Sequence, residues 1–209
     1  ASVGKIAPVA LRINPDIDPK THPYISTGLK KSKFGIAADR ALEEFHMAST
    51  LRHISVVGVH AHIGSQLTDV TPFVESLKKV LTLVDTLKGQ GIKIKYLNIG
   101  GGLGITYSDE KPPLPHELAE ALSPLVKGLD LTLIMEPGRV IVGNAGILVT
   151  KALYEKIGES KRFVIVDAAM NDLIRPSLYS AYHDIRPVSE ALLTRPKHPV
   201  DVVGPVCES

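Results

Sequence analysis

The chain has 209 residues, of which 44% are hydrophobic and 22% are charged, and its formal net charge is +2. This composition is typical of a folded globular protein, and so small a net charge gives no reason to expect nucleic acid as a partner. One cysteine excludes an intrachain disulfide, and no apolar run reaches the roughly 20 residues that a membrane helix needs. The first residues lack the pattern of a signal peptide, so we expect a protein that is neither secreted nor membrane-bound.

Strand-like and helix-like segments alternate along the chain. Apolar runs predict strands at 7–13, 55–63, 92–99 and 131–135. Amphipathic repeats predict helices at 37–51, 72–90 and 115–126. Alternation of this kind is typical of a parallel sheet with helical crossovers, and nearly continuous apolar strands favour a sheet covered on both faces. Further on, helical periodicity fades, and strands are predicted at 147–157, 162–167 and 200–206.

Three successive predicted strands end in polar or glycine-rich residues. The first leads into His60-Ala61-His62-Ile63-Gly64-Ser65-Gln66 and the second into Gly100-Gly101-Gly102-Leu103-Gly104. The third leads into Glu136-Pro137-Gly138-Arg139. Ligands of parallel α/β folds bind at the carboxyl ends of the strands, which in a (β/α)8 barrel form the active-site face. We therefore expect these three segments to form one site.

The glycine run suggests an anion site, because residues without Cβ let backbone N–H groups approach a phosphate closely. The run is not a dinucleotide fingerprint, since Ile105 and Tyr107 stand where G-x-G-x-x-G would need glycine. It is not a P-loop either, because no Gly-Lys-Ser/Thr follows it. The alternative interpretation is a glycine-rich turn that binds nothing.

His60 and His62 face the same side of their predicted strand because they are two residues apart. A zinc site would need a third ligand, and no acid or cysteine lies nearby in sequence, so we assign no metal. A histidine satisfied inside a barrel is the simpler interpretation of His60. His62 lies closer to the strand end, where its ring can stack on a planar ligand, and Ser65 offers a hydroxyl to a phosphate or a ring substituent.

Glu136 and Arg139 lie on either side of Pro137-Gly138, and the simplest interpretation is a surface ion pair of little value. However, Met135 closes an apolar strand, so we expect Glu136 at the mouth of a barrel. A carboxylate there is partly desolvated and needs a cationic partner, such as the protonated ring nitrogen of a cofactor. Arg139 offers a two-pronged donor to a carboxylate or phosphate.

A phosphate-binding turn, a stacking histidine and a carboxylate for a ring nitrogen together describe a pyridoxal 5'-phosphate (PLP) site. Six motifs in order make the sequence similar to the diaminopimelate decarboxylases, a family of PLP-dependent group IV amino-acid decarboxylases with an alanine-racemase-like barrel. The motifs are Ser32 to Gly35, His62 to Gln66, Gly100 to Gly104, Glu136 to Arg139, Asp167 to Tyr179, and Gly204 to Ser209.

The resemblance implies an α/β fold, a partial PLP-binding (β/α)8 TIM barrel that leads into a C-terminal β domain. Residues 1–145 would form the later part of the barrel, and residues 146–209 the start of the β domain with its substrate-binding residues. The implied enzyme is a carboxy-lyase that converts meso-2,6-diaminopimelate to L-lysine and CO2, the last step of lysine biosynthesis. The resemblance also implies a homodimer whose subunits share their active sites, in the bacterial cytoplasm or the plastid stroma.

The resemblance further implies a role for each matched residue. Cys207 is the implied proton donor, and His62 the implied ring-stacking residue of the reaction. The implied cofactor-binding residues are His62, Ser65, Gly100, Gly101, Gly102, Glu136, Pro137, Gly138 and Arg139. The implied substrate-binding residues are Arg139, Arg175, Tyr179 and Glu208.

Simpler interpretations exist for the residues near the end of the chain. Arg175 and Tyr179 are four residues apart, which places them on one side of a helical turn where they could serve packing alone. Cys207 could be an inert buried thiol, the usual state of a lone cysteine in a strand.

No lysine of the chain matches the lysine that carries the cofactor in this family, so we assign none. We therefore expect the chain by itself to lack decarboxylase activity, and a half-barrel to leave unpaired strand edges. Two alternatives remain for the parent protein: an ornithine- or arginine-type decarboxylase, and a PLP-binding homologue without catalytic activity.

Overall fold

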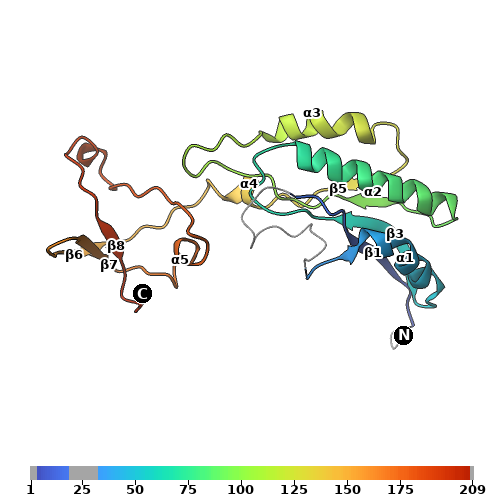
Figure 1. Cartoon of the computed structure of the whole chain (residues 1–209), viewed down its shortest axis with the longest axis horizontal. Helices are drawn as coiled ribbons and strands as arrows, with labels where there is room; N and C mark the ends of the chain where they lie inside the picture. The colour runs from blue at the N-terminus through green and yellow to red at the C-terminus, as the bar shows by residue number, and fades with distance from the viewer. Residues whose placement is uncertain (1–3, 19–32, 208–209) are drawn as a thin grey trace. The chain divides into compact units, whose positions relative to one another are not determined.

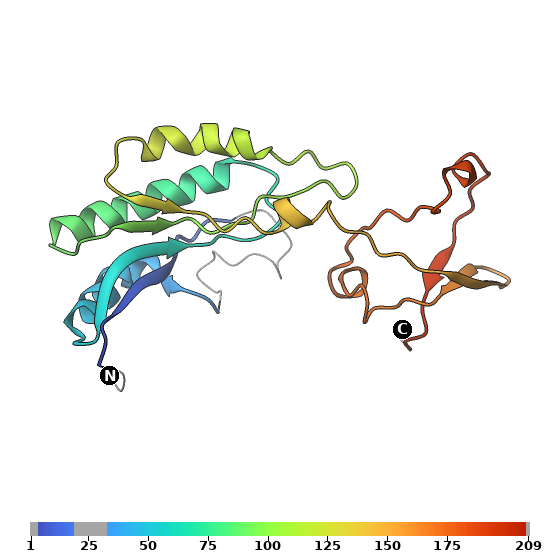
Figure 2. The same ribbon diagram turned by 180° about the vertical axis from the view of Figure 1, so that it is seen from behind.

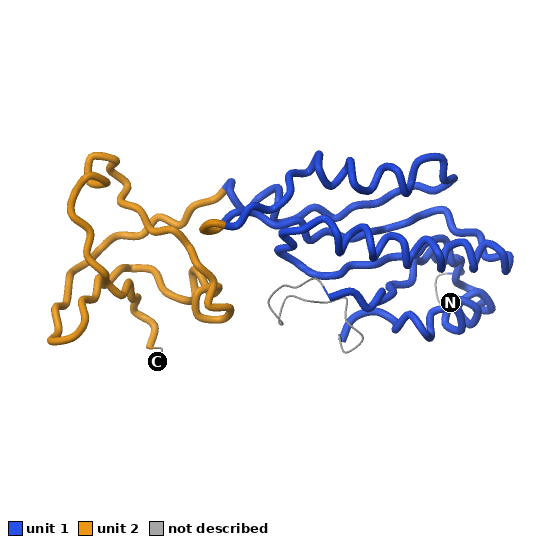
Figure 3. The backbone as a smooth tube through the Cα atoms, turned by 45° about the horizontal axis from the view of Figure 1, so that its top comes forward, with its two compact units in different colours: residues 1–106, 110–145 blue, residues 107–109, 146–209 orange. Residues whose placement is uncertain are grey.

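The structure is a computed structural model that describes residues 4–18 and 33–207. It falls into two compact units, which Figure 3 colours separately. Unit 1 comprises residues 1–106 and 110–145, and unit 2 comprises residues 107–109 and 146–209. Ser32, Glu208 and Ser209, which belong to the motifs above, lie outside the described residues. The division into a barrel domain and a substrate-binding β domain stays a prediction.

Unit 1 is built on an open five-stranded sheet in the order β2-β1-β3-β4-β5, in which every strand pair is parallel (Figure 1). The strands are β1 (Ala7–Asn14), β2 (Ile36–Ala37), β3 (Ile54–Ala61), β4 (Tyr96–Asn98) and β5 (Thr132–Ile134). The parallel α/β sheet that the alternation of segments predicts is confirmed. Within the described ranges the sheet does not close, so β2 and β5 are its two edges.

Helical crossovers connect the strands, and Figures 1 and 2 show α2 and α3 running alongside the sheet. The helices are α1 (Ala41–Thr50), preceded by the 3-10 turn η1 (Ala38–Arg40), then α2 (Thr71–Gly89), α3 (Pro115–Val126) and the short α4 (Arg139–Val142). The predicted helices at 72–90 and 115–126 are confirmed, whereas the one at 37–51 begins too early because Ala37 still pairs in β2. The short helix α4 was not predicted from the sequence.

The register of the sheet separates an apolar row from a polar row. Leu11, Val59 and Leu97 are neighbours across β1, β3 and β4, and Val59 and Leu97 are only 0% and 1% exposed. They pack into one core with buried residues of α1, α2 and α3, among them Phe45, Leu77, Val84, Leu87 and Leu118. Since side chains alternate along a strand, the next row points to the other face. That row is polar and consists of Arg12, His60 and Asn98.

The strand predicted at 92–99 is shorter in the structure, where only Tyr96–Asn98 pair. The apolar run is nevertheless meaningful, because Ile92 and Ile94 pack on the core of unit 1. Apolar residues indicate burial, whereas a strand also needs a backbone partner for its hydrogen bonds. In this segment the pairing with β3 starts at Lys95, whose N–H donates to the carbonyl of Val57.

Unit 2 contains a three-stranded sheet in the order β6-β7-β8, with β6 and β7 antiparallel and β7 and β8 parallel. Its elements are β6 (Ala152–Ile157), β7 (Arg162–Val166), α5 (Arg175–Tyr179), the 3-10 turn η2 (Glu190–Leu192) and β8 (Asp201–Val203). Of the described residues of unit 2, Val166 is the one buried hydrophobic residue. The strand predicted at 147–157 begins too early, because β6 begins at Ala152, and the strand predicted at 200–206 is longer than β8 at both ends. None of the helices in the described part of the chain is long and apolar enough to span a bilayer.

The core of unit 1 can be tested on one face of α1. Phe45 is fully buried, whereas Met47, two residues further on, is 54% exposed. Replacing Phe45 with Ala leaves a cavity, so Phe45→Ala should lower the free energy of unfolding by about 3–5 kcal/mol. The control, Met47→Ala, should change it by less than about 0.5 kcal/mol. Urea denaturation measures both, and equal losses would contradict this description of the core.

Candidate functional site

The carboxyl ends of β3, β4 and β5 hold Glu136 in place. Asn98, the last residue of β4, donates from Nδ2 to Glu136 Oε1 over 2.7 Å. The backbone N–H of Glu136 donates to the carbonyl of Gly100 over 2.8 Å, which continues the pairing of β4 and β5 beyond the strands. His60 Nε2 lies 3.5 Å from the same Oε1. Glu136 thus follows the apolar strand β5 and has polar neighbours in unit 1, with its side chain 50% exposed, and its place at the mouth of a barrel stays a prediction.

The glycine run packs against neighbouring backbone so closely that no side chain fits. A Cβ at Gly101 would lie 2.0 Å from the carbonyl oxygen of Glu136. A Cβ at Gly102 would lie 2.2 Å from the carbonyl oxygen of Gly64, and one at Gly100 would lie 2.7 Å from that of Ala61. The run therefore sits where the segments that follow β3, β4 and β5 meet, as the sequence predicts for one common site.

Two N–H groups of the run donate within the site itself. Gly100 N–H donates to Asn98 Oδ1 over 2.8 Å, and Gly101 N–H donates to His62 Nδ1 over 3.2 Å. These groups were predicted to face an anion, whereas in the structure both have acceptors within unit 1. They fix the positions of Asn98 and His62, and the binding of a phosphate by the run stays a prediction.

His62 is a neutral imidazole with an assigned tautomer. Because Nδ1 accepts the Gly101 N–H, the ring carries its proton on Nε2. Burial, followed by the nearby charge of Arg12, lowers the pKa of His62 below its usual 6.5. The ring plane is thereby fixed beside the glycine run, as a residue that stacks on a flat ligand requires.

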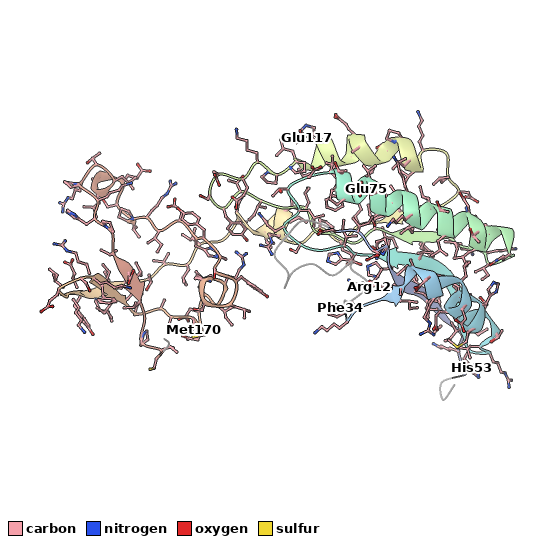
Figure 4. The ribbon with its side chains drawn as sticks, in the orientation of Figure 1. Arg12, Phe34, His53, Glu75, Glu117 and Met170 are labelled. Carbon is pink, nitrogen blue, oxygen red and sulfur yellow. The ribbon has the colours of Figure 1, made fainter. Side chains whose placement is uncertain are left out.

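Arg12 is a member of the site that the sequence analysis missed. Its Nη2 donates to the carbonyl of His62 over 3.3 Å, and its guanidinium carbon lies 5.1 Å from the ring centre of Phe34 (Figure 4). Burial lowers the pKa of Arg12, and the charge of Glu136 opposes this shift. The Lys33-Phe34-Gly35 motif thus contributes a ring against Arg12. An arginine inside the apolar strand of residues 7–14 was the signal that could have found it.

Ser65 and Arg139 meet in the structure. Arg139, the first residue of α4, donates from Nη2 to Ser65 Oγ over 3.1 Å. Pro137 and Gly138 connect Glu136 to this helix, and Gly138 accepts the N–H of Ile141 over 3.0 Å. A direct hydrogen bond therefore joins the segment after β3, which contains Ser65, to the segment after β5, which contains Arg139.

Gln66 ties the segment after β3 to the segment after the glycine run. Its amide oxygen accepts the N–H of Ile105 over 3.1 Å, and its amide nitrogen donates to the Ile105 carbonyl over 2.5 Å. The sequence analysis placed Gln66 in a motif without assigning it a task. The structure shows that it holds two loops of the site together.

Unit 2 holds Arg175 between two rings. Its guanidinium carbon lies 4.5 Å from the ring centre of Tyr107, and its Nη1 lies 3.2 Å from His183 Nε2. Burial, followed by the charge of Arg175, lowers the pKa of His183, which favours a neutral ring that accepts from the guanidinium. The helical turn predicted for Arg175 and Tyr179 is confirmed by α5. Neither Tyr107 nor His183 was singled out from the sequence.

Cys207 is exposed, so the alternative interpretation of a buried inert thiol is wrong. It belongs to unit 2, as do Arg175 and Tyr179, whereas His62, Glu136 and Arg139 belong to unit 1. Glu208 lies outside the described residues. In the described ranges, no three side chains of His, Cys, Asp or Glu gather as metal ligands would.

Comparison with known proteins decides the family. A family model described as the pyridoxal binding domain of pyridoxal-dependent decarboxylases matches residues 1–143. The chain belongs to this family. PLP is therefore its cofactor, and the roles of His62 and Glu136 toward the ring stay predictions.

Relatives among the pyridoxal-dependent decarboxylases match the whole chain. Diaminopimelate decarboxylase of Aquifex aeolicus is 52% identical over 99% of the chain and 49% of its own length. Diaminopimelate decarboxylase of Pseudomonas aeruginosa is 53% identical over 100% of the chain and 50% of its own length. A crystal structure of the Helicobacter pylori diaminopimelate decarboxylase complexed with L-lysine superposes with a TM-score of 0.92 at 48% identity, over 100% of this chain and 51% of that one. The chain thus spans about half the length of the relatives it matches.

The residues of unit 1 fit PLP chemically. A carboxylate whose contacts converge on Oε1 is available for the ring nitrogen, and His62 presents a fixed, neutral ring. The glycine run lies beside both residues, packed against the backbone of Ala61, Gly64 and Glu136. Ser65 and Arg139 add a hydroxyl and a cation suited to the phosphate.

The close approach at Gly101 predicts a specific intolerance. A Cβ there overlaps the carbonyl of Glu136, so Gly101→Ala must displace the segment that carries the carboxylate. We expect it to lower the free energy of unfolding by about 1–3 kcal/mol. Gly89→Ala is the matched control, because no atom lies within 4 Å of its Cβ position, and it should be neutral or slightly stabilising. Thermal melting compares the two variants, and a stable Gly101→Ala protein would show that the approach is looser than described.

The partly buried histidine His60 predicts a loss of stability in acid. Burial lowers the pKa of His60 below 6.5 in the folded protein, so the unfolded chain binds protons more readily as the pH falls through 6.5. Stability should be full above that pH and should fall below it, by at most about 1.4 kcal/mol per pH unit for each such histidine. His60→Gln should reduce this slope in urea denaturation between pH 7.5 and 5.5, values chosen roughly one unit either side of the ordinary histidine pKa. His116→Gln, at an exposed position on α3, is the control, and an equal effect of both variants would contradict the burial argument.

Proposed function

We propose that the complete protein to which this chain belongs catalyses the PLP-dependent decarboxylation of meso-2,6-diaminopimelate to L-lysine and CO2. The observation that carries this proposal is the position of the Glu136 carboxylate. Glu136 follows β5, accepts a hydrogen bond from Asn98 of β4, and lies near the ring of His62 and the glycine run. The assignment of diaminopimelate as the substrate is supported by the relatives named diaminopimelate decarboxylase, which are 52% and 53% identical to this chain. The enzyme is accordingly a carboxy-lyase of lysine biosynthesis.

The chain's residues divide the binding of the cofactor between them. Glu136 pairs with the ring nitrogen and keeps it protonated, while His62 stacks on the ring. Ser65, Gly100 to Gly102 and Gly138-Arg139 hold the phosphate end, with Pro137 fixing the path between them. Bound in this site, PLP supplies an electron sink for the electron pair left on the substrate carbon when the bond to the carboxylate breaks.

The substrate has a carboxylate at each end, and it needs more than one cation. Arg139 and Arg175 provide bidentate donors, and Tyr179 adds a hydroxyl to the group around Arg175. Tyr107 and His183 hold the Arg175 guanidinium in one orientation before substrate arrives. In this proposal Glu208 recognises the distal amino group, and the Cys207 thiol delivers its proton to the carbon that has lost CO2.

The proposed enzyme is a homodimer with shared sites and a closed TIM barrel. The exposed thiol of Cys207 supports the homodimer with shared sites, because an exposed group can reach a neighbouring subunit. The parallel order of β1, β3, β4 and β5 supports the closed TIM barrel. In the same proposal residues 1–145 belong to the barrel and residues 146–209 to the β domain. Because the relatives compared above are bacterial, we place the enzyme in a bacterial cytoplasm rather than in a plastid.

The substrate assignment can be tested at Arg175 in the complete protein. Arg175→Ala removes a charge-assisted pair to one substrate carboxylate, so the KM for meso-diaminopimelate should rise about 10- to 100-fold. Arg186→Ala is the control, since that arginine pairs with Asp184 on the surface of the same unit. Steady-state kinetics with meso-diaminopimelate and with ornithine measure both variants.

Two other outcomes of these kinetics would favour the two alternative functions. An unchanged KM in Arg175→Ala, together with turnover of ornithine, would favour a sister decarboxylase with one substrate carboxylate. Binding of PLP without turnover of either amino acid would favour a homologue that is not catalytic.

A further inference from the structure

Two side chains converge on one oxygen of Glu136. Asn98 Nδ2 lies 2.7 Å and His60 Nε2 lies 3.5 Å from Oε1. His60 and Asn98 are register partners on β3 and β4, so both project from the same face of the sheet. His60 Nε2 is buried and has no hydrogen-bond partner, although its side chain is 20% exposed as a whole. A buried nitrogen without a partner is costly, and the carboxylate is within a small movement of satisfying it.

The charges around His60 favour a neutral ring. Arg12 is its register partner on β1, His62 follows two residues later, just after β3 ends, and Glu136 lies beyond the end of β5. Burial is the main cause that lowers the pKa of His60, Arg12 lowers it further, and Glu136 opposes them. A neutral imidazole has one N–H to donate, and Arg12 cannot accept it because a guanidinium has no acceptor. Glu136 Oε1 is therefore the acceptor that the geometry offers.

Asn98 and a neutral His60 affect the Glu136 carboxylate differently from a cationic side chain. An amide and a neutral imidazole fix the orientation of a carboxylate but leave its negative charge uncancelled. A lysine or arginine at either position would pair with Glu136 and compete with any cationic ligand. Because both contacts are made with Oε1, Oε2 is left as the oxygen for such a ligand.

We propose that His60 is a positioning residue for Glu136: its Nε2–H donates to Oε1 and, together with Asn98, reserves Oε2 for the protonated ring nitrogen of PLP. This inference rests on the proposed function and adds a residue to it. His60 then acts through Glu136 and does not touch the reacting atoms. It replaces the earlier interpretation of His60 as a histidine that is merely satisfied inside the barrel.

The test compares two amides of different length at position 60 in the complete protein. The amide nitrogen of Gln reaches the place of Nε2, whereas that of Asn reaches only the place of Nδ1. Loss of a hydrogen bond to a charged group corresponds to about a tenfold effect. His60→Asn should therefore weaken PLP binding to the apoprotein about tenfold and lower kcat with little change in KM, while His60→Gln should stay within about threefold of wild type. His116→Asn, at an exposed position on α3, is the matched control.

A double-mutant cycle separates positioning from a structural role. In a Glu136→Ala background, His60→Asn should have no further effect on the dissociation constant of PLP, because its target is gone. Independent losses in the two positions, or equal losses in His60→Asn and His60→Gln, would overturn the inference. Melting of the apoproteins checks folding, and His60→Ala takes the place of His60→Asn if that variant does not fold. If the wild-type protein bound no PLP, the proposed function would fail and this inference with it.

Discussion

The contact between the backbone at Gly101 and the backbone at Glu136 is the constraint on which the site depends. A Cβ at Gly101 would lie 2.0 Å from the Glu136 carbonyl oxygen, so the two segments approach as closely as they do only because the side chain is absent. The same approach allows Glu136 N–H to donate to the carbonyl of Gly100. It also brings the Gly101 N–H to His62. One missing side chain therefore sets the distance between the carboxylate and the flat ring, the two groups that a pyridine cofactor needs.

Electrostatic balance is the second theme of the site. Burial lowers the pKa of His60 and of His62, and the charge of Arg12 lowers both further. Arg12 is itself committed to the carbonyl of His62 and to the ring of Phe34, which restrains it from moving onto Glu136. The result is a carboxylate supported by dipoles and not by a salt bridge. Its charge is preserved for a ligand, at the cost of a site that is less stable in acid.

Sequence patterns predicted the fold best where burial and pairing coincide. The helix at 115–126 matches the structure at both ends, because Pro115 can occupy its first turn and its apolar face is buried. The strand at 92–99 came out too long, since apolar residues can be buried without pairing. In the site, Glu136 stood out because it ends an apolar strand, whereas Asn98 did not, because a single amide inside a strand carries no pattern of its own. Tyr107 was missed because its partners in unit 2 follow much later in the chain.

The order of strands in unit 1 also has a consequence for how the protein is made. From β1 onward, β3, β4 and β5 take their places in the sheet in the order in which a ribosome would deliver them. Each is parallel to the strand before it, so each can dock only after the intervening crossover has emerged, and pairing is slow compared with that of a hairpin. Glu136 follows β5, the last of these strands to emerge. The segments that follow β3, β4 and β5 therefore come together only once the last of these strands has docked, so the site is assembled late in the folding of unit 1.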